Sequence, residues 1–276
     1  MTSGLSVCFL LGACLLISPS DIRADEHVTW LHTELRRHAA SEAHQGVAVD
    51  GDHFYAITNR EIGKYRKSDG VRVGGWEGAA DGPIQHLNSG IVIGDRLYVA
   101  HSNFPKQPAE SSLEIWDAVS MEPVERHVFA NAPGSLTWIV PYGGGPSGDK
   151  GWLACFAHYR SHGDPADSRV VHFNEAWQTV GSWSFPSALI QRFAGSSSSG
   201  GAIGPEGRLF VTGHDAKELY ILEVPDSPEG EFRWVDTLAI SAEGQAFAWD
   251  PDGSGTLYSI SRSQREVIVS KIARQP

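Results

Sequence analysis

A short hairpin unit recurs along the chain, and this repeat constrains the fold more than any other sequence feature. In each copy an apolar run leads through a tight turn into a second run rich in aromatic and aliphatic residues. Asp-Gly and Pro-x-Gly turns are hairpin signals because Gly easily adopts the positive φ that such turns need. The clear copies are GVAVDGDHFYAI (46–57), GIVIGDRLYVA (90–100), GAIGPEGRLFVTG (201–213) and AFAWDPDGSGTLYSIS (246–261), with a weaker copy at 136–157.

Further strand-like runs follow each hairpin, so the repeating unit is larger than a hairpin. Four antiparallel strands repeated about every 45 to 60 residues are typical of propeller blades. An all-β sandwich is the alternative, and one short helix is expected at 186–193. The third runs are 62–66, 113–117, 170–173, 219–224 and 267–272, and the fourth runs are 72–76, 124–129, 179–185 and 232–240.

The last unit stops after its third strand, because the chain ends there. The segment 28–37, which precedes the first hairpin, has the pattern of the missing strand. If it completes the last blade, it removes an exposed sheet edge and closes the ring. A sandwich does not account for the missing strand. We therefore predict an all-β, five-bladed propeller whose last blade is completed by the N-terminal strand.

The N-terminal residues predict an exported protein. The apolar run 5–17 is too short for a membrane span but has the length of a signal-peptide core. Ile22-Arg23-Ala24 is an acceptable cleavage site, so we expect a signal peptide at 1–24 and one domain at 25–276. The location is then periplasmic or secreted. The sequence LGAC offers an alternative, in which Cys14 is the lipidated residue of a lipoprotein.

Composition narrows the function classes. After the leader only Cys155 remains, so we expect no internal disulfide and a fold that depends on its hydrophobic core. The net charge is −11 and no run of Lys or Arg occurs, which argues against nucleic-acid or anionic-membrane partners. No other apolar stretch is long enough to span a bilayer. We expect a monomer whose partner is a small molecule or a glycan.

The propeller topology brings two sets of positions to one mouth of the central tunnel. The residues before a blade's first strand and those after its second strand share a face. In this chain they are polar and varied, as in a concave small-ligand site, and they include 5 of the 12 histidines. The positions are His44-Gln45, 86–89, 135–137, 197–199 and 243–245 before the first strands, and Asn59-Arg60, 101–103, 158–160, His214-Asp215 and Ser261-Arg262 after the second.

Three kinds of site fit this ring. Neutral imidazoles from several blades could hold a divalent metal with an open position, although no pair shows a local ligand spacing. A histidine near neutrality could instead act as acid or base beside Glu243, with Arg60, Arg160 or Arg262 holding an anionic or hydroxylated substrate. The third possibility is binding without chemistry, with Tyr159 and Trp138 as stacking faces.

The residue types assign provisional roles. The metal, if present, takes its ligands from five histidines, namely His44, His86, His101, His158 and His214. The expected catalytic residues are His44, His86, His101, His158, His214 and Glu243. The expected substrate-binding residues are Gln45, Asn59, Arg60, Asn88, Thr137, Tyr159, Gln245 and Arg262.

The blade motifs also resemble those of a known group of proteins. HQGVAVDGDHFYAI, HLNSGIVIGDRLYVAHSN, SSSGGAIGPEGRLFVTGHD and EGQAFAWDPDG look like secreted bacterial propellers of the cycloisomerase-like or lactonase-like kind. The first motif is also similar to the opening of the plant-type glutaminyl cyclases, which are five-bladed, but that similarity covers one blade. The broader resemblance covers nearly the whole mature chain and implies the fold. It implies little about the reaction, because propellers host many activities.

These observations lead to two hypotheses of different classes. The first is an exported propeller enzyme of lyase, cyclase or lactonase type, acting on a small carbohydrate-derived or lactone-like substrate at the His-rich mouth. The second is a non-catalytic propeller that binds a glycan or a protein. An enzyme should collect unlike residues at one asymmetric point, whereas a lectin-like propeller should repeat similar shallow pockets between blades. The variety of the mouth residues favours the enzyme.

Overall fold

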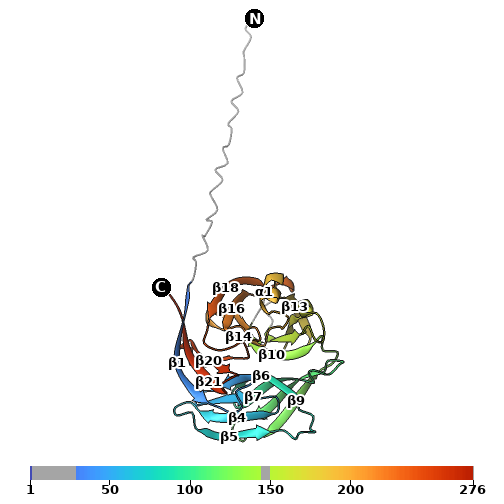
Figure 1. Cartoon of the computed structure of the whole chain (residues 1–276). Coiled ribbons are helices and arrows are strands. Elements are labelled where there is room, and N and C mark those ends of the chain that lie inside the picture. Colours follow the sequence, from blue (N-terminus) through green and yellow to red (C-terminus); the bar gives the residue numbers. More distant parts are fainter. Residues whose placement is uncertain (2–28, 144–149, 276) are drawn as a thin grey trace.

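The computed structural model describes Met1 and residues 29–143 and 150–275, so the predicted leader and Cys14 lie outside the described residues. Five antiparallel sheets stand around a central axis, as Figure 1 shows. This arrangement confirms the five-bladed propeller. Within the part of the chain described, no helix is long and apolar enough to cross a membrane.

Each blade has four antiparallel strands, ordered here from the axis outward. The first three blades are β2 (Gly46–Val49), β3 (His53–Ile57), β4 (Glu61–Arg66) and β5 (Arg72–Glu77); β6 (His86–Ile93), β7 (Arg96–Ser102), β8 (Ser111–Asp117) and β9 (Pro123–Phe129); and β10 (Ser135–Tyr142), β11 (Gly151–Ala157), β12 (Arg169–Asn174) and β13 (Thr179–Ser184). The last two are β14 (Gly200–Ile203), β15 (Leu209–Thr212), β16 (Glu218–Glu223) and β18 (Arg233–Ala239); and β19 (Ala248–Trp249), β20 (Thr256–Ser261), β21 (Glu266–Arg274) and β1 (Trp30–Ala39).

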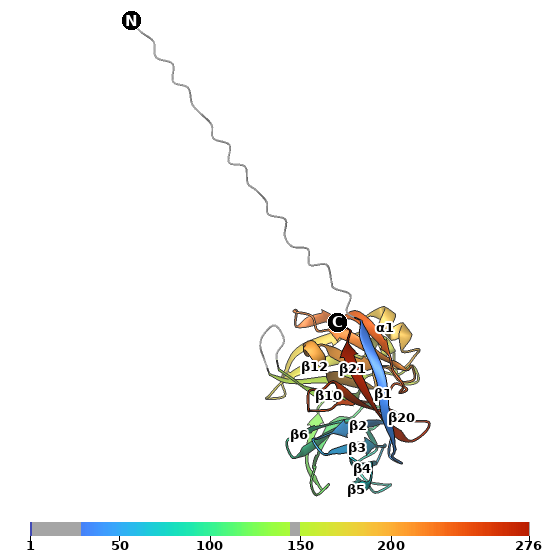
Figure 2. The ribbon, with the colours of Figure 1, turned by 90° about the vertical axis from the view of Figure 1, so that its left-hand side faces the viewer.

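The N-terminal strand completes the last blade, as predicted. β1 pairs antiparallel with β21, from Trp30 opposite Arg274 to Ala39 opposite Glu266. Figure 2 shows the two strands side by side. The indole of Trp30 meets the ring of Phe210 from the fourth blade edge to face, with centroids 5.5 Å apart. The two ends of the described domain therefore hold each other and close the ring.

Two elements lie outside the regular blades. The short helix α1 (Ser187–Arg192) follows β13, within the segment predicted to be helical. The strand β17 (Glu229–Glu231) was not predicted, and it pairs parallel with β13 as a fifth strand of the third blade. β17 is exposed and lacks apolar alternation, so the sequence pattern carries no signal for it. Two single-turn 3₁₀ helices, Pro165–Asp167 and Pro205–Gly207, lie in loops.

Large apolar side chains between the blades form the core. Trp116, Trp138 and Trp183 are almost fully buried, and Cys155, in β11, is completely buried. Burial of apolar area stabilises such a fold by roughly 25 cal/mol per Å². The fourth strands of four blades carry Trp30, Trp76, Trp183 and Trp234.

A ring of hydrogen bonds joins neighbouring blades at the tunnel entrance. At least one such bond crosses each of the five junctions between blades. These bonds join segments that are far apart in the sequence and so fix the shape of the entrance. They are Leu87 N–H to Asn59 O (2.9 Å), Asn88 Nδ2 to Leu136 O (2.8 Å), Thr137 Oγ1 to Ser198 O (2.8 Å), Thr212 Oγ1 to Gln245 O (2.7 Å) and Ala246 N–H to Gln45 O (3.2 Å).

Candidate functional site

The tunnel mouth holds a cavity of about 320 Å³, which we call the central well. All five blades or their loops contribute to it. Among the described residues that line it, none is Asp or Glu, although the chain as a whole is acidic. Its lining consists of Gln45, His86, Asn88, Ser102, Phe104, Ser135, Thr137, Tyr159, Ser161, Gly195, Ser196, Ser199, His214, Gln245 and Arg262.

The well brings together eight of the fourteen residues that the sequence assigned to the site. His44 lies outside it, in a neighbouring hollow, and Asn59 and Arg60 line that hollow and the groove described below. His101, His158 and Glu243 line none of these three cavities. The residues that reach the well are Gln45, His86, Asn88, Thr137, Tyr159, His214, Gln245 and Arg262.

A chain of three polar side chains reaches the well from the last two blades. The Arg262 guanidinium donates to His214 Nε2 over 3.1 Å, and His214 Nδ1 lies 2.7 Å from Asp215 Oδ1. Because a guanidinium only donates, Nε2 is the acceptor, and Nδ1 carries the proton that is donated to Asp215. This chain orients the imidazole and fixes its tautomer. A carboxylate behind and a cation in front are therefore arranged around one histidine.

Two further histidines near the well are kept neutral. Burial, followed by the nearby Arg262, Arg265 and His214, lowers the pKa of His44 to about 4. Burial also lowers the pKa of His86 to about 4, with smaller contributions from His44 and Arg262. At neutral pH these rings therefore offer hydrogen-bonding nitrogens and no charge. Arg262 then supplies the fixed positive charge of the well.

One wall of the well is aromatic. The ring of Phe104 lies 5.2 Å from that of Tyr159 and 5.4 Å from that of His86, centroid to centroid. His162 packs edge-on against Phe104 from outside the well, also at 5.2 Å. Burial raises the pKa of the Tyr159 phenol, which therefore stays protonated as a hydrogen-bond donor. Such a wall provides a flat apolar face beside polar groups, as sugar rings require.

His101 is a correction to the sequence-based site. It belongs to β7 itself, and side chains alternate along a strand, so its ring points away from the well while the next residue, Ser102, lines it. The Gln85 N–H donates to His101 Nε2 (3.0 Å), and Nδ1 bonds Ser112 Oγ (2.8 Å). Ser112 in turn donates to Glu114. This buried network stabilises the second blade.

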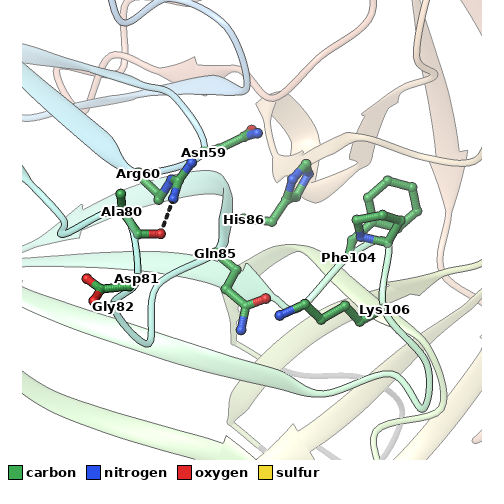
Figure 3. Close-up of a pocket in the computed structure, with 10 residues that line it drawn as sticks. Asn59, Arg60, Ala80, Asp81, Gly82, Gln85, His86, Phe104 and Lys106 are labelled. Atoms are coloured by element: carbon green, nitrogen blue, oxygen red, sulfur yellow. Dashed lines mark hydrogen bonds between the residues drawn. The ribbon is translucent and has the colours of Figure 1, made fainter.

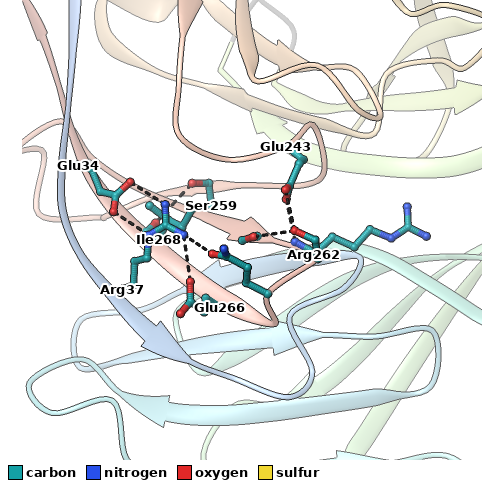
Figure 4. Close-up of polar contacts among 10 residues, drawn as sticks. Glu34, Arg37, Glu243, Ser259, Arg262, Glu266 and Ile268 are labelled. Carbon is teal, nitrogen blue, oxygen red and sulfur yellow. Dashed lines mark hydrogen bonds and ion pairs between the residues drawn. The ribbon is translucent and has the colours of Figure 1, made fainter.

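His158, Glu243 and Trp138 also differ from expectation. The His158 ring bonds the carbonyl of Pro133. Glu243 accepts from the backbone N–H of Arg262 (3.1 Å) and from Ser263 Oγ (2.9 Å), so its carboxylate holds the turn after β20 and makes no bond to a histidine. Figure 4 shows the Arg262 side chain extending away from Glu243. The Trp138 indole is fully buried and donates to Ser198 Oγ, so it cannot be a stacking face.

Several amides expected to bind substrate also support the entrance. Asn88 and Thr137 take part in the ring of hydrogen bonds between blades. Gln45 donates through Nε2 to Asn59 Oδ1 (2.6 Å), and Gln245 donates through Nε2 to the His214 carbonyl (3.1 Å). These residues therefore fix the shape of the well as well as its polarity.

The five histidines are not arranged as a metal site. Across residues 29–143 and 150–275, no group of three or more His, Cys, Asp or Glu side chains is placed to hold a metal ion. His101 and His158 make the structural bonds described above, and Arg262 occupies the Nε2 side of His214. The described residues therefore do not fit the divalent metal considered from the sequence.

The structure adds residues that were not assigned roles from the sequence. Phe104 follows the rim segment 101–103 by one residue, and Ser102 belongs to that segment. The Ser102 hydroxyl is buried, lines the well and has no hydrogen-bond partner among the described residues. A buried, unpaired hydroxyl is unfavourable unless water or a ligand pairs with it. The strand pattern predicted that this segment lies at the rim but not which of its side chains turn inward.

A second cavity, of about 560 Å³, adjoins the well, and we call it the side groove. It lies between the first two blades, and His86 and Phe104 line both cavities. On one wall of the groove Arg60 donates to the Ala80 carbonyl, as Figure 3 shows. The remaining lining residues are Asn59, Asp81, Gly82, Gln85, Pro105 and Lys106.

Comparisons with known proteins place the fold and leave the family open. No protein-family model matches the chain, and no curated protein matches it. A solved luciferin-regenerating enzyme is 12% identical, with a TM-score of 0.50, over 89% of this chain and 95% of that chain. At this identity the likeness bears on the propeller fold alone.

Two other solved structures have lower TM-scores. The β-propeller domain of Cps50 (Swd1) from Myceliophteria thermophila is 13% identical over 83% of this chain and 82% of that chain, with a TM-score of 0.42. A chain of the mitotic checkpoint complex is 14% identical over 81% of this chain, with a TM-score of 0.41. This chain spans 62% of the length of that protein.

Proposed function

We propose that the protein is an enzyme that hydrolyses a small sugar-acid lactone in the central well. The observation that carries the proposal is the lining of the well, in which the described residues combine Arg262 with two histidines and include no carboxylate. The chain as a whole has net charge −11, so a positively charged well is a local reversal of charge. Such a well favours an anionic product or a transition state bearing negative charge. The aromatic wall and the amide and hydroxyl groups suit a polyhydroxylated ring.

The orientation of His214 suits it to act as the base. Asp215 accepts from Nδ1, so the lone pair of Nε2 faces Arg262 at the well. When substrate draws the guanidinium toward its own oxygen, Nε2 becomes free to take a proton from water. The resulting hydroxide adds to the lactone carbonyl, and the imidazolium returns the proton to the departing ring oxygen. Water and lactone thus give one hydroxy acid, and no other reactant is needed.

Arg262 and Tyr159 fit the other two roles in this reaction. In the proposed reaction Arg262 binds the tetrahedral oxyanion and then the product carboxylate, with which a guanidinium forms paired hydrogen bonds. The phenol of Tyr159, kept protonated by its raised pKa, donates to a substrate oxygen. Neutral His86 contributes an uncharged hydrogen-bonding nitrogen beside the ring.

Hydrolysis of D-galactono-1,4-lactone, followed by acid release, tests the proposal. We expect turnover by the native protein and a loss of about 100-fold or more in kcat/KM for His214→Gln, the usual range for a general base. Arg262→Gln should also lower kcat. His53→Gln is the control, because His53 lies at the start of β3 on the opposite face and should leave turnover unchanged. Absence of turnover, or equal rates for native protein and His214→Gln, would reject the proposal.

A non-catalytic glycan-binding function is the second candidate. It is favoured by the side chain of Asp215, which is 81% exposed, whereas a carboxylate that orients a catalytic histidine is commonly buried. Saturable binding of gluconate that is weakened by Arg262→Gln, together with no lactone turnover, would select this candidate. The exported location predicted from the leader is compatible with both proposals.

A further inference from the structure

The side groove continues the central well toward the rim between the first two blades. His86 and Phe104 each line both cavities, so the two spaces meet at this pair of rings. The well measures about 320 Å³ and the side groove about 560 Å³, so the groove is the larger of the two. A ligand held at Arg262 therefore has room to extend past Phe104.

The chemistry of the side groove differs from that of the well. The groove contains one carboxylate, Asp81, two cationic side chains, Lys106 and Arg60, and the amides of Gln85 and Asn59. In Figure 3 the Lys106 side chain points into the cavity toward Gln85, while Asp81 lies on the other side of it. The groove therefore offers carboxylate, cationic and amide groups beside an aromatic edge, and these groups can pair with the many hydroxyl groups of a neutral sugar ring.

The groove walls are held by the fold. Asn103 accepts the Glu110 N–H (3.0 Å) and donates to the Pro108 carbonyl (3.0 Å), so the loop that carries Phe104 and Lys106 is tied at its base. On the other wall, Arg60 donates to the Ala80 carbonyl and its own carbonyl accepts the Gly78 N–H (2.8 Å). These bonds fix the loop that carries Asp81. The groove is therefore a shaped extension of the site.

We propose that the natural ligand is of disaccharide size: an aldonic acid or its lactone, with a neutral sugar ring attached. The acidic or lactone unit lies in the central well at Arg262, and the neutral ring lies in the side groove against Phe104. Its hydroxyl groups bond to Asp81, Gln85 and Lys106. This inference rests on the proposed function for the placement of the acidic unit, and it adds the size and class of the substrate.

Calorimetric titration with gluconate and with two disaccharide acids, lactobionate and maltobionate, tests the inference. At least one disaccharide acid should bind about tenfold more tightly than gluconate, equivalent to about 1.4 kcal/mol. Lys106→Ala and Asp81→Ala should each remove about fivefold of this gain and leave gluconate binding within twofold of native. Arg262→Gln should weaken all three ligands. Lys271→Ala is the matched control, because Lys271 bonds the Ser254 carbonyl at the turn between β19 and β20 on the opposite face.

The outcomes separate this inference from the proposed function. If gluconate binds and depends on Arg262 while neither disaccharide acid binds more tightly, the extended ligand is rejected and the well remains a site for single sugar acids. If Lys106→Ala weakens gluconate as much as the disaccharide acids, the side groove is likewise rejected as a separate subsite. If no aldonate binds, both the proposed function and the extension fail.

Discussion

His101 shows how the direction of one side chain decides between a role in the site and a role in the core. Both His101 and His214 were expected just after the second strand of their blades, yet only His214 reaches the central well. Because His101 is still within β7, the pleat directs its ring to Ser112 and the Glu114 network. His214 follows the end of β15 and is free to face Arg262.

Because His101 is buried, we expect the free energy of unfolding to decrease in acid. Burial, with Arg126 and His86 as lesser causes, lowers its pKa to about 4 in the folded protein, against about 6.5 when unfolded. Between these values only the unfolded chain binds the proton, so stability is lost as the pH falls from 6.5 to 4. The Glu114 carboxylate, 3.7 Å away, favours the protonated ring and limits the loss to about 1–3 kcal/mol.

Urea unfolding at a series of pH values measures this effect. His44 and His86 titrate in the same direction, so the informative quantity is the difference in pH slope between native protein and His101→Gln. The variant should lose less stability between pH 7 and pH 4 than the native protein does. Equal slopes would show that His101 is not held neutral by the fold.

Replacement of Gly46 should also lower stability, because inner strands of neighbouring blades approach each other closely there. A methyl group there would lie 2.6 Å from the Ala246 Cβ and 3.2 Å from the Asn88 carbonyl oxygen. Gly46→Ala should therefore destabilise the protein by about 1–3 kcal/mol, the usual cost of overpacking. Gly51→Ala is the control, since a methyl group there meets no atom within 4 Å. Denaturant midpoints of the two variants that coincide would contradict the tight packing of the ring.

Among the strands, the closing strand β1 contains two adjacent residues whose replacement should affect stability very differently. Trp30 is 7% exposed and packs against Phe210, whereas Leu31 on the same strand is 46% exposed. Trp30→Ala should cost about 3–5 kcal/mol of unfolding free energy, while Leu31→Ala should change it by less than about 0.5 kcal/mol. Chemical denaturation of both variants measures the contrast. A small loss for Trp30→Ala would mean that β1 contributes little to ring closure.

The sequence predicts the blades well because their signals are local. Period-2 alternation and Gly-containing turns mark most strands, and the unpaired last blade predicts the partner of β21. The pairing of β17 with β13 has no such signal, because Glu229–Glu231 is polar and its partner is distant in sequence. Side-chain direction at the rim escapes prediction for a similar reason. Whether a rim residue faces the well depends on where its strand ends, and β7 runs through Ser102, two residues past its predicted end.

The site was predicted as a place more successfully than as a set of residues. Topology alone brings the ends of the inner hairpins to one mouth, and there the structure assembles His86, His214 and Arg262. The topology does not reveal that Glu243 binds a turn or that Trp138 is buried, because both depend on packing between blades. Phe104 was missed because the loop that carries it is shaped by Asn103, one residue earlier.

Considered as a whole, the molecule has a tunnel with two unlike ends. The mouth holds the central well with Arg262 and its histidines. The opposite end has a cavity of about 300 Å³ lined mainly by apolar residues, among them Ile139, Val140 and Trp249. An anionic polyhydroxy ligand should therefore select the mouth, because Arg262 lines it, whereas the described residues that line the opposite end include Asp250 and no Lys or Arg.

This polarity predicts a salt dependence of ligand binding. Attraction between a carboxylate and Arg262 is screened as ionic strength rises, though less than for fully exposed charges. Gluconate affinity should therefore fall several-fold between 0.01 M and 0.5 M salt in the native protein and change little in Arg262→Gln. Calorimetry at the two salt concentrations measures both. A native affinity that does not respond to salt would argue against a charge-based site.

NMR of the histidine ring nitrogens during titration with gluconate tests whether the well binds a sugar acid at Arg262 and thereby frees His214. Without ligand, His214 should carry its proton on Nδ1. Gluconate should shift the His214 Nε2 resonance saturably, and Arg262→Gln should abolish the shift. An unchanged His214 resonance at saturating gluconate, or shifts confined to residues at the apolar end of the tunnel, would contradict it.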